Sequence, residues 1–218
     1  MSMRLLALVS GGIDSPVAVH LLQKAGHHVD VVHFNMGRFA AWEEGHSKDG
    51  PSRVESHLRI LAKLAGRELR LFEVENEPAL ELIVTRGGKL ACVLCKRNMV
   101  RVAGAIANEN GYGALAMGDS LGQVASQTMD NICTVEGATP MPIIRPLIGL
   151  DKSEIMAIAR AIGTYAISVG DAPVCKALPV MPATRADPAR AEAVEAGLGW
   201  LESPPKLVVR ERVIGPGV

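Results

Sequence analysis

Residues 8–20 decide the fold and read Leu8-Val9-Ser10-Gly11-Gly12-Ile13-Asp14-Ser15-Pro16-Val17-Ala18-Val19-His20. An apolar strand passes through a Ser-Gly-Gly-x-Asp-Ser turn directly into a helix. The two glycines let the backbone approach an anion closely, and the helix directs free N–H groups and its positive dipole end at the same place. Residues 10–15 therefore predict a phosphate-binding loop. It is not a Walker A motif, because no Gly-Lys-Ser/Thr follows the glycines.

The composition favours a single α/β domain. The chain has 218 residues, of which 48% are hydrophobic and only 3% aromatic. This length supports one sizeable core, and the abundance of Val, Ile, Leu and Ala suits a parallel sheet covered by helices on both faces. The 23 basic and 23 acidic residues give a net charge of zero, so the whole chain has no strong attraction for nucleic acid. The chain shows neither a signal-peptide core nor a transmembrane stretch, and we expect a cytoplasmic protein.

Strand and helix signals alternate along the chain. Expected strands cover residues 4–9, 29–34, 68–74 and 114–117, and a long irregular connection covers residues 35–50. Capping boxes that predict helix starts are Ser52-x-x-Glu55, Ser120-x-x-Gln123 and Asp151-x-x-Glu154. The βαβα order predicts a doubly wound, mainly parallel sheet with helices on both faces and ligands at the carboxyl ends of its strands.

Several motifs resemble one enzyme family. Residues 10–15 resemble the pyrophosphate loop (PP-loop) of the ATP pyrophosphatases, which cleave ATP between the α and β phosphates to adenylate a substrate. Four further segments resemble the tRNA 4-thiouridine synthetases: residues 118–128, 144–155, 162–165 and 182–184. The resemblance implies a Rossmann-like fold of the adenine nucleotide alpha hydrolase type. We expect residues 1–186 to form this PP-loop domain and residues 187–218 to form a helix and a partly ordered tail.

The resemblance implies an ATP-dependent sulfur transfer. Enzymes of this family adenylate the O4 carbonyl oxygen of uridine 8 in tRNA, release pyrophosphate and replace the activated oxygen with sulfur, which gives 4-thiouridine. A carbonyl oxygen is a poor leaving group until it carries AMP. Two alternatives stay open. One is an adenylating ligase or amidotransferase acting on a small molecule, and the other is a non-catalytic module that senses ATP or redox state.

The nucleotide site is expected around the loop. The resemblance implies contacts with ATP from Leu8, Val9, Ser10, Gly11, Gly12, Asp14, Ser15, His33, Phe34, Arg97, Gly118 and Gln127. Asp14 is also a catalytic candidate, and Asp14 and Asp119 are candidates for holding Mg²⁺ through oxygen ligands. His33 and Phe34 fit a core position equally well, since they end a predicted strand.

Cys92 and Cys95 form a Cys-x-x-Cys motif at a helix start. Residues three apart lie on one helical face, so both sulfurs can reach one centre. The neighbouring Lys96, Arg97 and Arg101 and the helix N-terminus favour thiolate over thiol. The motif alone also fits a reduced dithiol, half of a zinc site or a redox pair.

The family resemblance adds Cys175 as the sulfur-handling cysteine. Cys92, Cys95 and Cys175 together would be catalytic and would suit a [4Fe–4S] cluster with one open iron. The alternative is a persulfide on Cys175 that Cys92 or Cys95 resolves. Cys133, inside a helical pattern, is predicted to be a buried apolar residue.

The expected partners are tRNA and a sulfur donor. The family carries an RNA-binding THUMP region before the loop, whereas nine residues precede Ser10 here. We therefore expect a separate RNA-binding partner, or an oligomer such as a homodimer, to present the tRNA. Many bacterial members pass a persulfide through a rhodanese-like domain, and no such domain fits after residue 186. The donor is therefore expected to be sulfide or a cysteine desulfurase.

Overall fold

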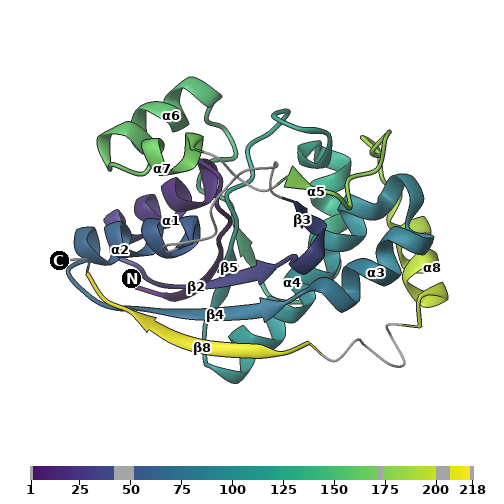
Figure 1. The fold of residues 1–218 in the computed structure, drawn as a ribbon, viewed down its shortest axis with the longest axis horizontal. Helices are drawn as coiled ribbons and strands as arrows, with labels where there is room; N and C mark the ends of the chain where they lie inside the picture. Colours follow the sequence, from purple (N-terminus) through teal and green to yellow (C-terminus); the bar gives the residue numbers. More distant parts are fainter. Residues whose placement is uncertain (1, 42–51, 171–173, 200–206, 217–218) are drawn as a thin grey trace.

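A parallel sheet forms the centre of the molecule (Figure 1). The computed structural model describes residues 2–41, 52–170, 174–199 and 207–216. The strands of the main sheet are β1 (Arg4–Leu8), β2 (His28–Asn35), β4 (Leu69–Glu75), β5 (Ala114–Ala116), β6 (Ile143–Ile144) and β8 (Val209–Ile214). They lie in the order β6-β5-β1-β2-β4-β8, and β8 alone runs antiparallel to its neighbour. The predicted doubly wound, mainly parallel sheet is confirmed.

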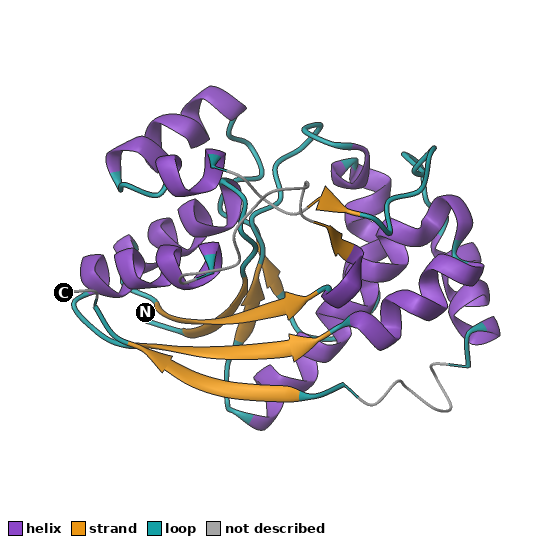
Figure 2. Cartoon of the chain, viewed as in Figure 1, coloured by secondary structure: helices purple, strands orange, loops and turns teal. Residues whose placement is uncertain are grey.

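Helices cover both faces of this sheet (Figures 1 and 2). The α-helices are α1 (Asp14–Lys24), α2 (Arg53–Ala65), α3 (Glu77–Arg86), α4 (Ala91–Glu109), α5 (Met129–Glu136), α6 (Lys152–Ala161), α7 (Tyr165–Val169) and α8 (Pro188–Gly197). Short 3₁₀ turns are η1 (Gly37–Phe39), η2 (Gly88–Leu90) and η3 (Ala125–Gln127), and a separate two-stranded sheet pairs β3 (Ala40–Ala41) with β7 (Val174–Cys175). No helix within the described residues combines the length and hydropathy needed to cross a bilayer.

The alternation of side chains along β1 explains why helices pack on both faces of the sheet. Leu5 and Ala7 pack in one hydrophobic cluster with α1 and α2, whereas Leu6 and Leu8 pack in another with α3 and α4. Successive side chains of a strand point to opposite faces, so a continuous apolar strand is buried on both sides. This arrangement leaves the carboxyl edge of the parallel strands, where residues 10–15 lie, as the place for polar chemistry.

Of the three helix starts predicted from capping boxes, the structure confirms two. Ser52 Oγ accepts a hydrogen bond from the Glu55 amide, and Asp151 with Glu154 forms a reciprocal capping box. The third prediction is wrong, because residues 121–124, directly after Ser120, form turns and bends and not a helix. The Ser120 hydroxyl instead donates to the Leu150 carbonyl, 2.7 Å away, and so ties two loops together.

The C-terminal residues belong to the same fold. Strand β8 pairs with β4 along its full length, and Glu195 of α8 is buried against Arg97 of α4. The predicted partly ordered tail is therefore wrong for residues 209–214. Of the irregular connection predicted over residues 35–50, residues 42–50 lie outside the described part of the chain.

His57 on α2 carries a pH-dependent contribution to stability. The residue is fully buried, and its Nε2 lies 3.0 Å from Ser168 Oγ of α7. Burial, with a smaller contribution from the nearby charge of Arg53, lowers the pKa of His57 from 6.5 to about 4. Between these two pH values the unfolded chain binds a proton at His57 and the folded chain does not, so stability falls as the pH drops.

We expect His57 alone to decrease the free energy of unfolding by about 3 kcal/mol between pH 7 and pH 4. The variant His57→Gln should show a correspondingly shallower loss of stability over this range. Urea unfolding at pH 7, 5.5 and 4.5 measures the difference, with His27→Gln as the control. Parallel stability curves for the wild-type chain and His57→Gln would contradict the assignment.

Candidate active site

The turn between β1 and α1 has a defined internal structure. The Ser10 amide donates to Ser15 Oγ over 2.9 Å, and the Ser15 hydroxyl donates to the Ser10 carbonyl over 3.2 Å. The Gly12 amide donates to Ser10 Oγ over 3.3 Å. Helix α1 then begins at Asp14, and the amides of a first helical turn have no acceptor within their own helix. The two serine hydroxyls thus shape a loop whose remaining amides can bind an anion.

Gly118 makes this turn sterically possible. A Cβ atom on Gly118 would lie 2.9 Å from both N and Cα of Ser15, which is closer than real Cβ contacts and involves backbone atoms that cannot rotate away. A Cβ on Gly12 would meet only Ser10 Oγ, at an ordinary 3.5 Å. The strict steric requirement for glycine therefore lies at Gly118, in the segment that follows β5.

A cavity of about 200 Å³ opens beside the loop at the carboxyl edge of the sheet. Its walls are Leu8, Val9, Ser10, Gly12, Asp14, Ser15, Phe34, Lys96, Met99, Met117, Gly118, Asp119 and Gln127. All the predicted nucleotide contacts except Gly11, His33 and Arg97 lie in these walls. The side chain of Gln127 is buried, and its Oε1 has no hydrogen-bond partner among the described residues. That oxygen can accept a hydrogen bond from a ligand.

Three predicted contacts lie outside the cavity walls. His33 Nδ1 lies 2.9 Å from the Val9 carbonyl, and burial lowers the pKa of this histidine. His33 therefore supports a wall residue from behind. Gly11 belongs to the loop, and its carbonyl accepts a hydrogen bond from Arg53.

The prediction for Arg97 is wrong in this structure. Its side chain is 2% exposed, and Nε and Nη2 donate to the two carboxylate oxygens of Glu195 over 2.9 and 2.8 Å. The guanidinium is thus engaged with α8 rather than with the nucleotide cavity. Lys96, its neighbour on α4, is the cation that enters the cavity wall.

Two lysines that the sequence reasoning did not assign to the nucleotide site pair with the predicted acidic residues. Lys152 Nζ lies 2.6 Å from Asp14 Oδ1, and Lys96 Nζ lies 2.9 Å from Asp119 Oδ1. Arg145 Nε adds a contact of 3.4 Å to Asp119 Oδ2. The helix start at Asp151 was the available signal for Lys152, because it fixes the following residue at the first turn of α6.

The acidic residues therefore do not form a prepared metal site. Asp14 and Asp119 both line the cavity, but each already has a cationic partner. The described residues contain no group of three or more His, Cys, Asp or Glu side chains arranged to hold a metal ion. Binding of Mg²⁺ by Asp14 and Asp119 stays a prediction.

Three cysteines gather near the cavity. Cys92 and Cys95 lie in the first turns of α4, and Cys175 lies in β7, opposite Ala40 of β3. Cys175 is exposed, whereas the other two are partly buried. Cys175 is close enough that its charge contributes to raising the pKa of both. The convergence of all three sulfurs on one centre stays a prediction, and the described residues contain no group of three or more His, Cys, Asp or Glu side chains arranged to hold a metal ion. The shared [4Fe–4S] cluster and the persulfide on Cys175 both stay predictions.

The predicted thiolate character is wrong. Burial is the main cause that raises the pKa of Cys92, and it raises the pKa of Cys95 to about 12. Lys96 lowers both values but is a smaller influence than burial. The prediction for Cys133 is wrong as well, since this residue is exposed on α5.

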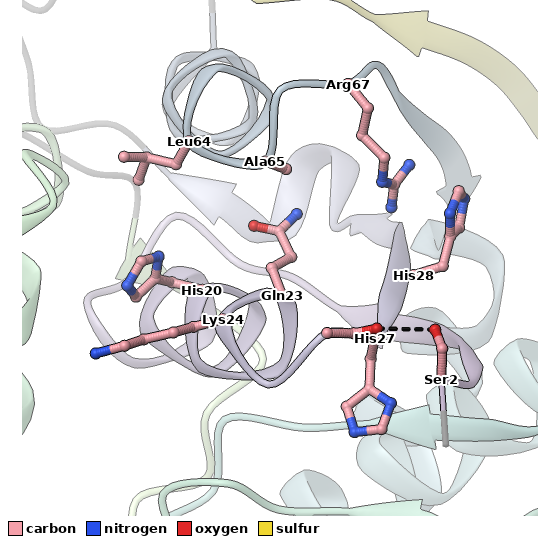
Figure 3. Close-up of a pocket in the computed structure, with 10 residues that line it drawn as sticks. Ser2, His20, Gln23, Lys24, His27, His28, Leu64, Ala65 and Arg67 are labelled. Carbon is pink, nitrogen blue, oxygen red and sulfur yellow. Dashed lines mark hydrogen bonds between the residues drawn. The ribbon is translucent and has the colours of Figure 1, made fainter.

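A second cavity lies at the opposite edge of the sheet (Figure 3). It has a volume of about 440 Å³, and its walls include His20, Gln23, His27, His28 and Arg67. The imidazoles of His20, His27 and His28 point in different directions and do not converge on one point (Figure 3). It contains none of the predicted site residues, so size alone does not identify the active site.

Comparison with known proteins identifies the family. A family model described as "Thiamine biosynthesis protein (ThiI)" matches residues 1–198. The chain belongs to the ThiI family. A "Probable tRNA sulfurtransferase" of Methanothermobacter thermautotrophicus is 42% identical over 216 residues, which are 96% of this chain and 51% of the relative. A protein of the same name from Thermus thermophilus is 44% identical over 186 residues, 84% of this chain and 44% of that protein.

A solved structure supports the same relationship. A 4-thiouridine synthetase in complex with RNA and with bound ATP superposes with a TM-score of 0.84 at 35% identity. The match covers 97% of this chain and 55% of the other. The predicted ThiI-like family and fold are confirmed, and the chain spans about half the length of the curated relatives it matches.

Gly118→Ala should weaken ATP binding at least tenfold, because the new methyl group would displace the Ser15 backbone and with it the phosphate loop. Calorimetric titration with a non-hydrolysable ATP analogue measures this. Gly149→Ala is the matched control, since a Cβ there meets nothing within 4 Å. Equal affinity in the two variants would show that the close approach is not needed.

Proposed function

We propose that this chain is the catalytic part of a tRNA sulfurtransferase. It uses ATP to adenylate the O4 carbonyl oxygen of uridine 8 and then replaces this oxygen with sulfur, which gives 4-thiouridine. The observation that carries the proposal is the position of Lys96, which lies in the nucleotide cavity wall and directly follows Cys95 on α4. A loop for phosphate and a group of thiols thus meet at one edge of the sheet. The ATP and RNA bound to the solved relative support the same ligands here.

Adenylation is the first step. Loop amides and the N-terminus of α1 bind the phosphates, and Leu8, Phe34 and Met117 provide the apolar wall against the adenosine. Lys96 and Lys152 bring positive charge to the phosphates, and their acidic partners hold both lysines in place. The uridine oxygen attacks the α-phosphorus, and pyrophosphate leaves. Asp14 and Asp119 would be the oxygen ligands of a Mg²⁺ ion bound with ATP, which would neutralise phosphate charge.

Sulfur transfer is the second step. The exposed Cys175 attacks the outer sulfur of a persulfide carried by a cysteine desulfurase, so that the donor's S–S bond breaks, Cys175 becomes the persulfide and the donor cysteine leaves as a thiol. The terminal sulfur attacks C4 of the adenylated uridine, and AMP leaves with the oxygen. Cys92 or Cys95 then attacks the Cys175 sulfur, which releases 4-thiouridine and leaves a disulfide between the two cysteines. An external thiol reduces this disulfide before the next cycle.

The tRNA reaches this site with help from outside the catalytic domain. The net charge of the chain is zero, which gives no general attraction for RNA. We therefore propose presentation by an RNA-binding partner or within a homodimer, in the cytoplasm. The catalytic domain extends beyond residue 186 in this proposal, because β8 and α8 pack into its sheet and helices.

With tRNA, Mg²⁺ and a sulfur donor, the chain should convert ATP to AMP and pyrophosphate, because the loop lacks the lysine of a γ-phosphate-transferring Walker A motif. Chromatography of the spent nucleotide and mass spectrometry of digested tRNA measure the two products. ADP as the sole nucleotide product would refute adenylation. AMP without sulfur in the tRNA would favour the adenylating ligase instead.

Cys175→Ser should lower the rate of tRNA thiolation at least a hundredfold. The rate of AMP formation on tRNA should stay within a factor of about two of the wild-type rate, because only the second step uses the persulfide. Cys133→Ser is the matched control, since Cys133 is also exposed but lies on α5. Thiolated nucleoside is quantified after digestion of the tRNA. Normal thiolation by Cys175→Ser would exclude this residue as the sulfur carrier.

A further inference from the structure

Asn76 is a fully buried polar residue that the nucleotide site does not use. It precedes α3 at the N-cap position, where asparagine normally accepts a hydrogen bond from a first-turn amide. Its side chain makes no such cap. Its backbone is nevertheless well anchored, because the Asn76 amide donates to the Asn35 carbonyl over 2.8 Å. The Asn76 side chain is therefore available for a contact other than the N-cap hydrogen bond.

The orientation of the Asn76 amide is set by a second asparagine. Asn98 Nδ2, itself buried, donates to Asn76 Oδ1 over 3.1 Å. This contact assigns the oxygen and turns the Asn76 Nδ2 donor the other way. The donor then faces two sulfurs, Cys95 Sγ at 3.8 Å and Met36 Sδ at 3.6 Å. Asn98 and Cys95 lie three residues apart on α4, so both ends of this relay belong to one helical face.

A buried amide donor aimed at sulfur is an inefficient pairing for a resting protein. Thiol and thioether sulfurs are weak acceptors, whereas a buried N–H group left poorly satisfied costs free energy. The same N–H becomes a strong partner once the sulfur carries negative charge. The Cys95 thiol itself donates to Met99 Sδ over 3.7 Å, and among the described residues the charged groups that act on Cys95 include one cation, Lys96, which is already paired with Asp119.

We propose that Asn76 is a positioning residue for the sulfur chemistry of Cys95. Held by Asn98, its side-chain amide fixes the Cys95 sulfur and presents an N–H group to the electron-rich sulfur formed there when Cys95 acts on Cys175. This inference rests on the proposed function and deepens it, since it assigns the resolving role to Cys95. The role is one of orientation and charge stabilisation, because Asn76 does not contact the nucleotide cavity.

The test compares Asn76→Leu with the double variant Asn76→Leu/Asn98→Leu. The single change removes the donor but leaves Asn98 without its acceptor, whereas the double change removes both polar partners and is the milder one for folding. Each is made in a chain in which Cys92 and Cys175 are replaced by serine, so that Cys95 and the exposed Cys133 are the remaining thiols. Mass spectrometry then follows the modification of each cysteine by methyl methanethiosulfonate.

Both variants should modify Cys95 roughly tenfold more slowly than the parent, with Cys133 unchanged as the internal reference. In chains with all cysteines present, both variants should lose thiolation about tenfold while AMP formation on tRNA stays within a factor of about two. A merely structural role for Asn76 predicts the opposite sign, since a loosened helix start exposes Cys95 and speeds its modification.

Unchanged or faster modification of Cys95 in the double variant overturns the inference. Full thiolation by the double variant overturns it too. Failure of the proposed function has a different signature, because the parent chain with all cysteines would then form no thiolated tRNA, while the effect of Asn76 on Cys95 modification would still be measurable.

Discussion

The close approach of Gly118 to the Ser15 backbone is the constraint on which the site depends. It joins the end of β5 to the first turn of α1, so that the phosphate loop and the residues after β5 form one wall. The approach needs both partners. The Ser10 and Ser15 hydroxyls hydrogen-bond within the loop, and the absence of a side chain at Gly118, just after β5, leaves the space that the loop occupies. The parallel order of β1 and β5 places these two turns at the same edge of the sheet.

A buried ion pair extends the domain past the point where the motifs end. Arg97 and Glu195 are both almost fully enclosed and meet through two hydrogen bonds, and Arg101 adds a third to the same carboxylate. Removing one partner of such a pair would leave a buried charge, which costs about 3–5 kcal/mol in typical cases. Helix α8 is therefore locked onto α4, the helix that carries Cys92 and Cys95. The C-terminal segment thus stabilises the helix that carries Cys92 and Cys95.

The fold and most of the walls of the cavity beside residues 10–15 could be predicted because they rest on local signals. Apolar strands, glycines and caps are read within a few residues, and a motif such as residues 10–15 carries its own geometry. Three features were missed or predicted wrongly because they depend on contacts between residues far apart in the sequence. Lys152 meets Asp14 across 138 residues, Arg97 turns to a helix 98 residues away, and strand β8 is recognised only by its pairing with β4. The thiolate prediction failed for another reason. It counted nearby positive charges, whereas the burial that raises the pKa of Cys95 depends on packing from the whole fold.

That burial is compatible with the proposed sulfur transfer, because adenylation and sulfur transfer are separate steps. A thiol that stays protonated at rest does not compete with uridine for the adenylate and is a poor nucleophile toward stray oxidants. Cys175, on the exposed side of the group, can meet a donor without opening the core. Lys96 stands between the two chemistries, since it lines the nucleotide cavity and lowers the pKa values of both Cys92 and Cys95. In this structure Lys96 forms an ion pair with Asp119, and its charge can also attract phosphates or an ionising thiol. The geometry thus places one cation where the state of the nucleotide and the reactivity of the thiols can influence each other through electrostatics alone.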